Sequence, residues 1–315
     1  MLSIRGITCC VVVIAMLIGA CDAVRTPRGA ARHAQSEIAK MPGVEDVSIN
    51  YSDGFAHANA LRIELDLTKT SEPAIATVAR RLNELLPAHG EAVDRTIVVA
   101  VGHRLFAERG PDLDPEQIAD DTSRLRRIGV LLPEATVRWT RRASLSSVRL
   151  DGIHSPGAAL AAARQGFEDQ PVSVVIAAAD RDLPRWEVSL PFTVEQEAAV
   201  EQLLGLLDLV VRWVTVRAGR ITTLSVAVRN SDTAYADLVD TIVALQPTRE
   251  NPVLLHWSLV GDPGRERKFA GSVHIGGCAY GDSREGGELT PEKFYSVEAI
   301  AVRKRLRTEF DMCPR

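Results

Sequence analysis

The stretch Leu61-Arg62-Ile63-Glu64-Leu65-Asp66-Leu67 decides the fold class of this chain. Its apolar and charged residues alternate, which is the pattern of a β-strand with one face in the core and the other in water. The period then changes, because apolar residues recur at helical spacing between Ile75 and Leu86. A half-buried strand beside an amphipathic helix predicts a sheet with helices packed on one face.

This pattern recurs along the chain. The first copy opens with an expected helix over about residues 30–40, and the second opens at Asp114-Pro115, where an N-cap precedes a proline at the first helical position. The third opens with Thr193-Val194-Glu195-Gln196, which matches a capping box. The tripeptide Val-Arg-Trp occurs both at 137–139 and at 211–213, which favours true repetition.

Each copy is expected to contain a helix, two strands, a second helix and a further strand, which is close to a ferredoxin-like split βαβ unit. We therefore predict an α+β fold of tandem ferredoxin-like (αββαβ-type) repeats, with antiparallel sheets and helices on one face. We expect six segments, with boundaries where the hydrophobic pattern of the sequence changes. They comprise a signal peptide at 1–20, a tether at 21–29, repeat modules at 30–112, 113–192 and 193–276, and a glycine-rich loop with a C-terminal helix at 277–315.

The composition is that of a folded protein and disfavours nucleic acid as a partner. Hydrophobic residues make up 46% of the chain, charged residues 25%, and the formal net charge is −4. Phosphate backbones are bound by a concentrated basic field, which this balance does not supply. Basic clusters at 124–127 and 303–307 lie in helical patterns, where we expect solvated helix faces.

The N-terminus has the three parts of an export signal. Arg5 precedes an apolar run over residues 7–18, and the small residues Gly19 and Ala20 come directly before Cys21. The run is too short for a transmembrane helix, which needs roughly 20 apolar residues.

The sequence Ile18-Gly19-Ala20-Cys21 resembles the lipobox of bacterial membrane lipoproteins. The resemblance covers only the N-terminal segment. It implies that signal peptidase recognises Ile18, Gly19 and Ala20 and that Cys21 becomes an acylated N-terminus. Two or more acyl chains on one residue give a stable anchor, so the expected location is the outer side of the cell membrane. The alternative is an ordinary secretory signal that ends near a cysteine.

Cysteine usage agrees with export. Once the signal and the lipidated residue are set aside, the remaining cysteines are Cys278 and Cys313. Outside the cytoplasm these two are expected to form a disulfide, the alternative being two separate buried thiols.

Few residues carry recognisable chemistry. The sequence has no Gly-x-Ser-x-Gly elbow, no His-Glu-x-x-His pair and no Gly-x-x-x-x-Gly-Lys phosphate loop. The turn Met41-Pro42-Gly43 resembles one found in heavy-metal-associated domains, but no Cys-x-x-Cys precedes any expected helix. We therefore expect no catalytic residue, metal or cofactor. The histidines occur singly, and Trp139 and Trp257 are expected in the core.

These observations favour an extracytoplasmic, membrane-anchored lipoprotein that acts as a noncatalytic interaction or structural module of the cell envelope. Its expected partners are the membrane, through the lipid, and an envelope protein. The alternative is an envelope enzyme or small-ligand receptor with a site formed between modules from residues far apart in the sequence.

Overall fold

The computed structural model describes residues 26–52, 59–86, 93–110, 114–142, 145–167, 170–180, 182–261, 268–277 and 291–310. The chain divides into two compact units, unit 1 from Met1 to Ser147 and unit 2 from Val148 to Arg315. The division falls inside strand β6 (Leu145–Ile153), within the span expected for the second repeat module. Each unit is described by itself.

In unit 1, hairpins of two strands alternate with helices. The elements are α2 (Pro27–Ile38), β1 (Asp46–Ser52), β2 (Asn59–Asp66), α3 (Glu72–Leu85), β3 (Val93–Gly102), β4 (Leu105–Arg109), α4 (Pro115–Leu131) and β5 (Thr136–Arg142). β1 pairs antiparallel with β2, and β3 pairs antiparallel with β4. Strands joined by a helix, β2 with β3 and β4 with β5, pair in parallel.

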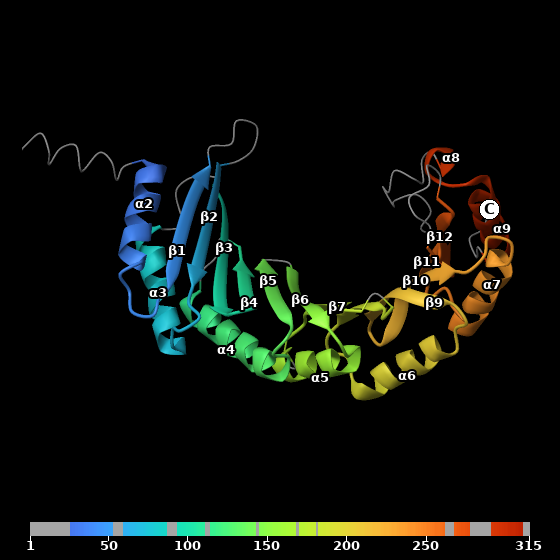
Figure 1. The fold of residues 1–315 in the computed structure, drawn as a ribbon, viewed down its shortest axis with the longest axis horizontal. Coiled ribbons are helices and arrows are strands. Elements are labelled where there is room, and N and C mark those ends of the chain that lie inside the picture. Colours follow the sequence, from blue (N-terminus) through green and yellow to red (C-terminus); the bar gives the residue numbers. More distant parts are fainter. Residues whose placement is uncertain are drawn as a thin grey trace, which may run out of the picture. The chain divides into compact units, whose positions relative to one another are not determined.

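The core of unit 1 lies between the sheet and its helices. Figure 1 shows α2, α3 and α4 along one face of strands β1 to β5. The alternation that predicted β2 is observed, because Ile63 and Leu65 are buried while Arg62 and Glu64 are exposed. Leu82 of α3 and Ile97 of β3 have no exposed surface. One face of the strands therefore forms the core, and the other carries polar side chains.

Unit 2 repeats this arrangement. Its elements are α5 (Pro156–Phe167), β7 (Ser173–Ala178), β8 (Arg185–Ser189), α6 (Val194–Gly205), β9 (Val210–Arg217), β10 (Arg220–Val228), α7 (Ala234–Leu245), β11 (Val253–Leu259), β12 (Ala270–Ile275), α8 (Pro291–Phe294) and α9 (Val297–Phe310). The pairs β7/β8, β9/β10 and β11/β12 are antiparallel. The helix-linked pairs β8/β9 and β10/β11 are parallel.

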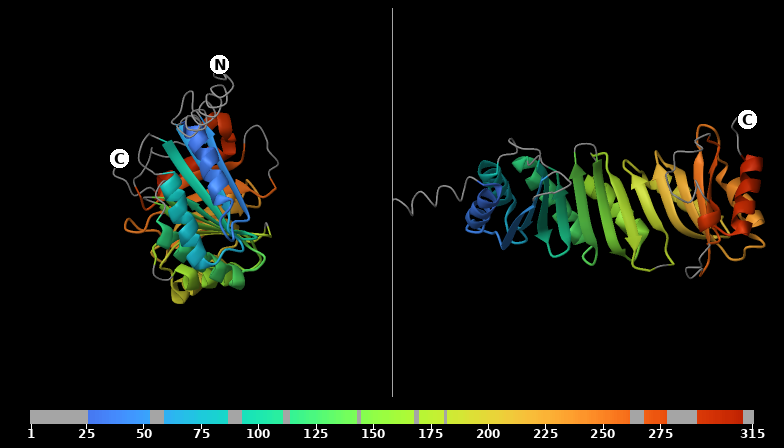
Figure 2. Two further views of the ribbon diagram at one scale, coloured as in Figure 1. Left: turned by 90° about the vertical axis from the view of Figure 1, so that its left-hand side faces the viewer. Right: turned by 90° about the horizontal axis from the view of Figure 1, so that it is seen from above.

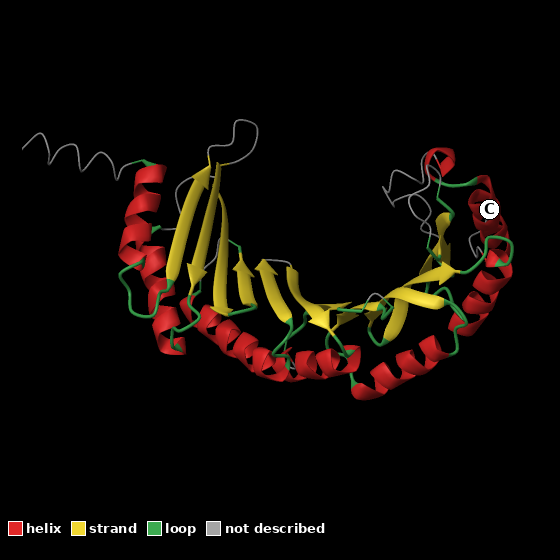
Figure 3. Cartoon of the chain, viewed as in Figure 1, coloured by secondary structure: helices red, strands yellow, loops and turns green. Residues whose placement is uncertain are grey.

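The helices α5, α6, α7 and α9 lie on one side of the strands of unit 2 (Figure 3). The right-hand view of Figure 2 looks onto β7 to β10 from the opposite side, which no described helix of unit 2 covers. We call this side the helix-free face of unit 2.

The predicted α+β fold of tandem ferredoxin-like repeats is wrong. The twelve strands follow one another in sequence order in a mixed sheet, which makes the fold α/β. A split βαβ unit separates its two parallel strands by another strand. Here the parallel strands are direct neighbours, as in β2/β3 and β10/β11. The repeating element is a hairpin followed by a helix, and two such elements were interpreted together as one ferredoxin-like module.

Alternation along the strands correctly predicts the buried side for two tryptophans, but the repeated tripeptide does not predict it for a third. Trp139 and Trp257 are 1% and 2% exposed on the helix-covered face, which confirms both as core residues. Trp213 occupies the same place in the Val-Arg-Trp pattern as Trp139 but is half-buried on the opposite face, because its neighbour Val214 is the fully buried residue. The two copies of the Val-Arg-Trp tripeptide therefore do not occupy equivalent positions in the structure.

The helix starts predicted at Asp114 and Thr193 are confirmed. Asp114 accepts hydrogen bonds from the backbone N–H groups of Glu116 and Gln117, and Thr193 forms the complete capping box with Gln196. The interpretation of residues 124–127 as a solvated face is wrong for Arg126, which lies partly buried. Its guanidinium donates to the carbonyl oxygens of Leu67, Thr68, Thr70 and Val101 at 2.7–3.3 Å.

Candidate functional site

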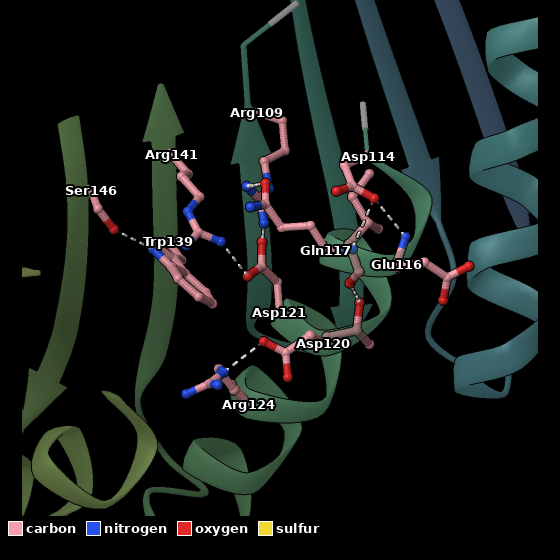
Figure 4. A network of polar contacts seen from close by, with 12 residues as sticks. Arg109, Asp114, Glu116, Gln117, Asp120, Asp121, Arg124, Trp139, Arg141 and Ser146 are labelled. Atoms are coloured by element: carbon pink, nitrogen blue, oxygen red, sulfur yellow. Dashed lines mark hydrogen bonds and ion pairs between the residues drawn. The ribbon is translucent and has the colours of Figure 1, made fainter. Parts of the chain in front are cut away.

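Two polar arrangements stand out among the described residues, one buried in unit 1 and one open in unit 2. The first is centred on Asp121 of α4, whose side chain is 1% exposed. Its carboxylate forms ion pairs with Arg109 of β4 and with Arg141 of β5, the latter with 3.0 Å between Nη1 and Oδ1 (Figure 4). Arg109 also donates to Oε1 of Gln117 at 2.9 Å. The cluster therefore joins α4 to two strands.

An aromatic ring packs against both arginines of this cluster. The guanidinium carbons of Arg109 and Arg141 lie 5.7 and 5.2 Å from the ring centroid of Trp139. The indole Nε1 of Trp139 donates to Oγ of Ser146 at 3.1 Å (Figure 4). Cations at this distance from an indole are attracted by the ring's negative face.

The charges of the Asp121 cluster compensate one another. Burial, and after it the like charge of Arg141, lowers the pKa of Arg109 to about 9. Burial also lowers the pKa of Arg141. Arg109 is still protonated at neutral pH, and the carboxylate of Asp121 stabilises that charge at close range. Asp121 is buried and paired with two arginines, so its carboxylate links α4 to β4 and β5.

The second arrangement is the helix-free face of unit 2. The register places Arg185 of β8 beside Trp213 of β9, and the guanidinium carbon of Arg185 lies 5.5 Å from the ring centroid. One pleat further along, Glu187 forms an ion pair with Arg217 at 3.4 Å between Oε1 and Nη2. The side chains that point toward the helices at these positions, Trp186 and Val188, are buried. The face therefore presents charged and aromatic groups that the core does not use.

A cavity of about 740 Å³ opens at one end of this face. It lies where β9 ends, β10 begins and residues 250–252 lead into β11. Its polar lining consists of Arg217, Arg220, Thr222, Thr223, Glu250, Asn251 and His274. Arg220 donates from Nη1 to Oδ1 of Asn251. A cavity of this size can accommodate a small ligand.

A tight turn positions the two arginines. Ala218 and Gly219 both have positive φ angles, 49° and 74°, as in the turns that join two-residue β-hairpins. The turn makes Arg217 and Arg220 a cross-strand pair. The positive φ of Gly219 favours glycine there, and a Cβ atom would also lie 2.5 Å from Nε2 of the Gln196 side chain, which would have to move.

Two further cavities in unit 2 are smaller. One of about 290 Å³ lies between the ends of α6 and α7 and shares Arg220 and Asn251 with the first. The other, of about 100 Å³, is bordered by Leu206, Arg229 and Asp237. Neither places two arginines side by side.

The histidines occur singly in the sequence. His33, His103 and His154 are exposed, and His57 and His89 lie outside the described residues. The structure brings His256 and His274 to one face as diagonal neighbours on β11 and β12, because His274 pairs with Leu254, two residues before His256. This proximity depends on strand register, which the sequence alone does not reveal. Within the described ranges, no three histidine, cysteine, aspartate or glutamate residues group as metal ligands.

The remaining predicted site residues lie outside the part of the chain that the structure describes. These are Ile18, Gly19, Ala20 and Cys21 of the lipobox and the expected disulfide partners Cys278 and Cys313. Among the described helices, none is both long and apolar enough to cross a membrane.

Searches against protein-family models, curated proteins and solved structures found no match to this chain.

Proposed function

We propose that this chain is a lipoprotein of the bacterial cell envelope, anchored through acylated Cys21 on the outer side of the membrane. The lipobox sequence and the cysteine at its end support the anchor. Acyl chains on that residue would hold the folded units close to the membrane surface.

The anchored protein acts by noncatalytic binding of an envelope protein through the helix-free face of unit 2. The observation that carries this part is the contrast between the two faces of one sheet. One face is packed with helices, and the other presents Arg185 stacked on Trp213 and Glu187 paired with Arg217. Arginine and tryptophan are the residue types most enriched where proteins bind one another.

The anchor is tested by metabolic labelling with a fatty-acid probe. Cys21→Ala should lose the label and leave the membrane fraction. Cys10→Ala is the matched control, because this cysteine lies inside the apolar run and its removal should leave labelling unchanged. Full labelling of the Cys21→Ala variant would contradict acylation at that residue.

The binding face is tested by placing a photoactivatable amino acid at single positions in the native host. Position 185 on the helix-free face should give a discrete crosslinked protein. Position 243 is the control, since Val243 on α7 is 63% exposed on the helical side. Crosslinks from position 243 alone, or from neither position, would overturn the assignment of this face.

One observation supports the alternative of an enzyme or small-ligand receptor, namely the cavity beside Arg217 and Arg220. That cavity lies within unit 2, whereas the alternative expected a site between modules.

A further inference from the structure

Two arginines face each other at the mouth of the largest of the three cavities described above. Arg217 and Arg220 form a cross-strand pair at the end of the β9–β10 hairpin. Both belong to the helix-free face, because their strand neighbours Val216 and Ile221 are buried on the other side. Like charges directly opposite each other destabilise a sheet. The two-residue turn between them leaves the backbone no freedom to separate them.

The protein compensates only one of these charges. Arg217 forms its ion pair with Glu187 at 3.4 Å. Arg220 instead donates to the neutral amide oxygen of Asn251, and within the described residues no carboxylate lies at ion-pair distance from it. Asn251 is held in place by its own side-chain hydrogen bond to Thr248 at 3.4 Å. The cavity lining carries two guanidinium groups and one carboxylate, that of Glu250, so it has an excess of one positive charge, and the hydrogen bond to Asn251 positions Arg220.

We propose that this cavity binds the phosphate group of a small hydroxylated ligand. A phosphate has several terminal oxygens and can accept hydrogen bonds from both guanidinium groups at once, which also relieves their mutual repulsion. A carboxylate, with two oxygens, is satisfied by one arginine fork. Thr223 adds a hydroxyl group on the same face, and exposed Glu250 supplies an acceptor for a ligand hydroxyl.

The phosphate can come from a soluble metabolite or from a lipid headgroup. This inference concerns only the cavity at one end of the helix-free face, and it requires neither the anchor nor a protein partner bound to that face. A failed crosslink at position 185 would therefore not contradict the phosphate site. A failed titration would not contradict the proposed protein-binding face.

The test is isothermal titration of the full-length chain, purified in a non-ionic detergent at low salt. The probes are inorganic phosphate, glycerol 3-phosphate and dihexanoyl phosphatidylglycerol. Glycerol 3-phosphate should bind more tightly than inorganic phosphate, because only the former carries alcohol hydroxyl groups. Saturable binding of glycerol 3-phosphate assigns a soluble source, and binding of the lipid alone assigns a headgroup; either supports the phosphate site.

The variants Arg217→Gln and Arg220→Gln should each weaken binding about tenfold or more, because hydrogen bonds to charged groups are among the strong ones. Arg229→Gln removes the same charge from unit 2 outside this cavity and should bind as the parent does. Arg220→Lys retains the charge and should bind with intermediate affinity. An absence of binding by all three probes, an equal response to acetate, or equal weakening by Arg229→Gln would each overturn the proposal.

Discussion

Removal of the Asp121 carboxylate should destabilise unit 1 far more than removal of its neighbour in the sequence. Asp121 and Asp120 are consecutive residues of α4 with opposite environments. Asp121 is 1% exposed and pairs with two arginines, whereas Asp120 is 52% exposed and pairs with Arg124 one helical turn away. Substitution of each by asparagine changes the same atoms, so any difference reports the environment.

The size of the difference follows from burial. In the Asp121→Asn variant, Arg109 retains its charge with a side chain only 4% exposed, but loses the carboxylate that pairs with it. Breaking a buried ion pair in this way typically costs about 3–5 kcal/mol of unfolding free energy. Exposed pairs spaced by four residues on a helix contribute only about 0.3–0.5 kcal/mol. Asp120→Asn should therefore lie close to the parent.

Amide hydrogen exchange is the assay that resolves this effect, because it reports the opening free energy of each segment separately. In Asp121→Asn, amides of β4, α4 and β5 should lose about 3–5 kcal/mol of protection. Amides of β9 to β11 should be unchanged.

A second variant separates charge burial from packing. Arg109→Met combined with Asp121→Leu removes both members of the most buried pair and leaves Arg141, which is 23% exposed and can reach solvent. This double variant should recover most of the lost stability, because replacing a whole buried pair with apolar residues is often neutral. If Asp121→Asn is no worse than Asp120→Asn, or the double variant is as unstable as Asp121→Asn, the assignment of Asp121 as a charge-compensating residue is refuted.

Three further stability predictions can be checked by urea unfolding. Arg126→Ala should destabilise unit 1 by about 1.5–3 kcal/mol, because a charged donor to four carbonyl oxygens is lost, while exposed Arg127→Ala should change the unfolding free energy by less than about 0.5 kcal/mol. Gly271→Ala should cost about 1–3 kcal/mol, since the added Cβ would lie 2.3 Å from the Trp257 ring, whereas Gly205→Ala meets no atom within 4 Å and should be tolerated. Thr193→Ala should cost about 1 kcal/mol by removing the capping box of α6, and an unchanged midpoint would show that the cap contributes nothing.

Local features of the fold were predictable, and the order of its strands was not. The alternation in β2 and the buried sides of Trp139 and Trp257 follow from a spacing of two residues, and the caps at Asp114 and Thr193 follow from the residue types that begin a helix. The choice between a split βαβ unit and adjacent parallel strands depends on whether the strand after each helix pairs directly with the strand before it. This pairing is decided by contacts between the strands themselves, such as β2 with β3 and β10 with β11. The hydrophobic periodicity of the sequence does not reveal it.

The two polar arrangements were missed for a related reason. Arg109, Asp121 and Arg141 lie on three different elements, and the basic cluster at 124–127 drew attention to charge along one helix only. Arg217 and Arg220 were within reach of sequence reasoning, because Ala218-Gly219 between two strand patterns predicts a tight hairpin. A two-residue turn makes the flanking residues a cross-strand pair, which places their charges together.

Adjacent strands joined by hairpins and helices also explain why no catalytic or binding motif is visible in the sequence. In unit 2 the residues facing the helices, such as Val214 and Leu255, are fully buried, so a substitution there disturbs the core. Residues of the helix-free face alternate with them and contribute little to packing. The lining of the cavity comes from the end of β9, the start of β10, the segment before β11, and one position each on β11 and β12. Single substitutions on such a surface can therefore create a preference for a ligand. In the sequence, each of these residues is only one more polar position in the alternating pattern of its strand.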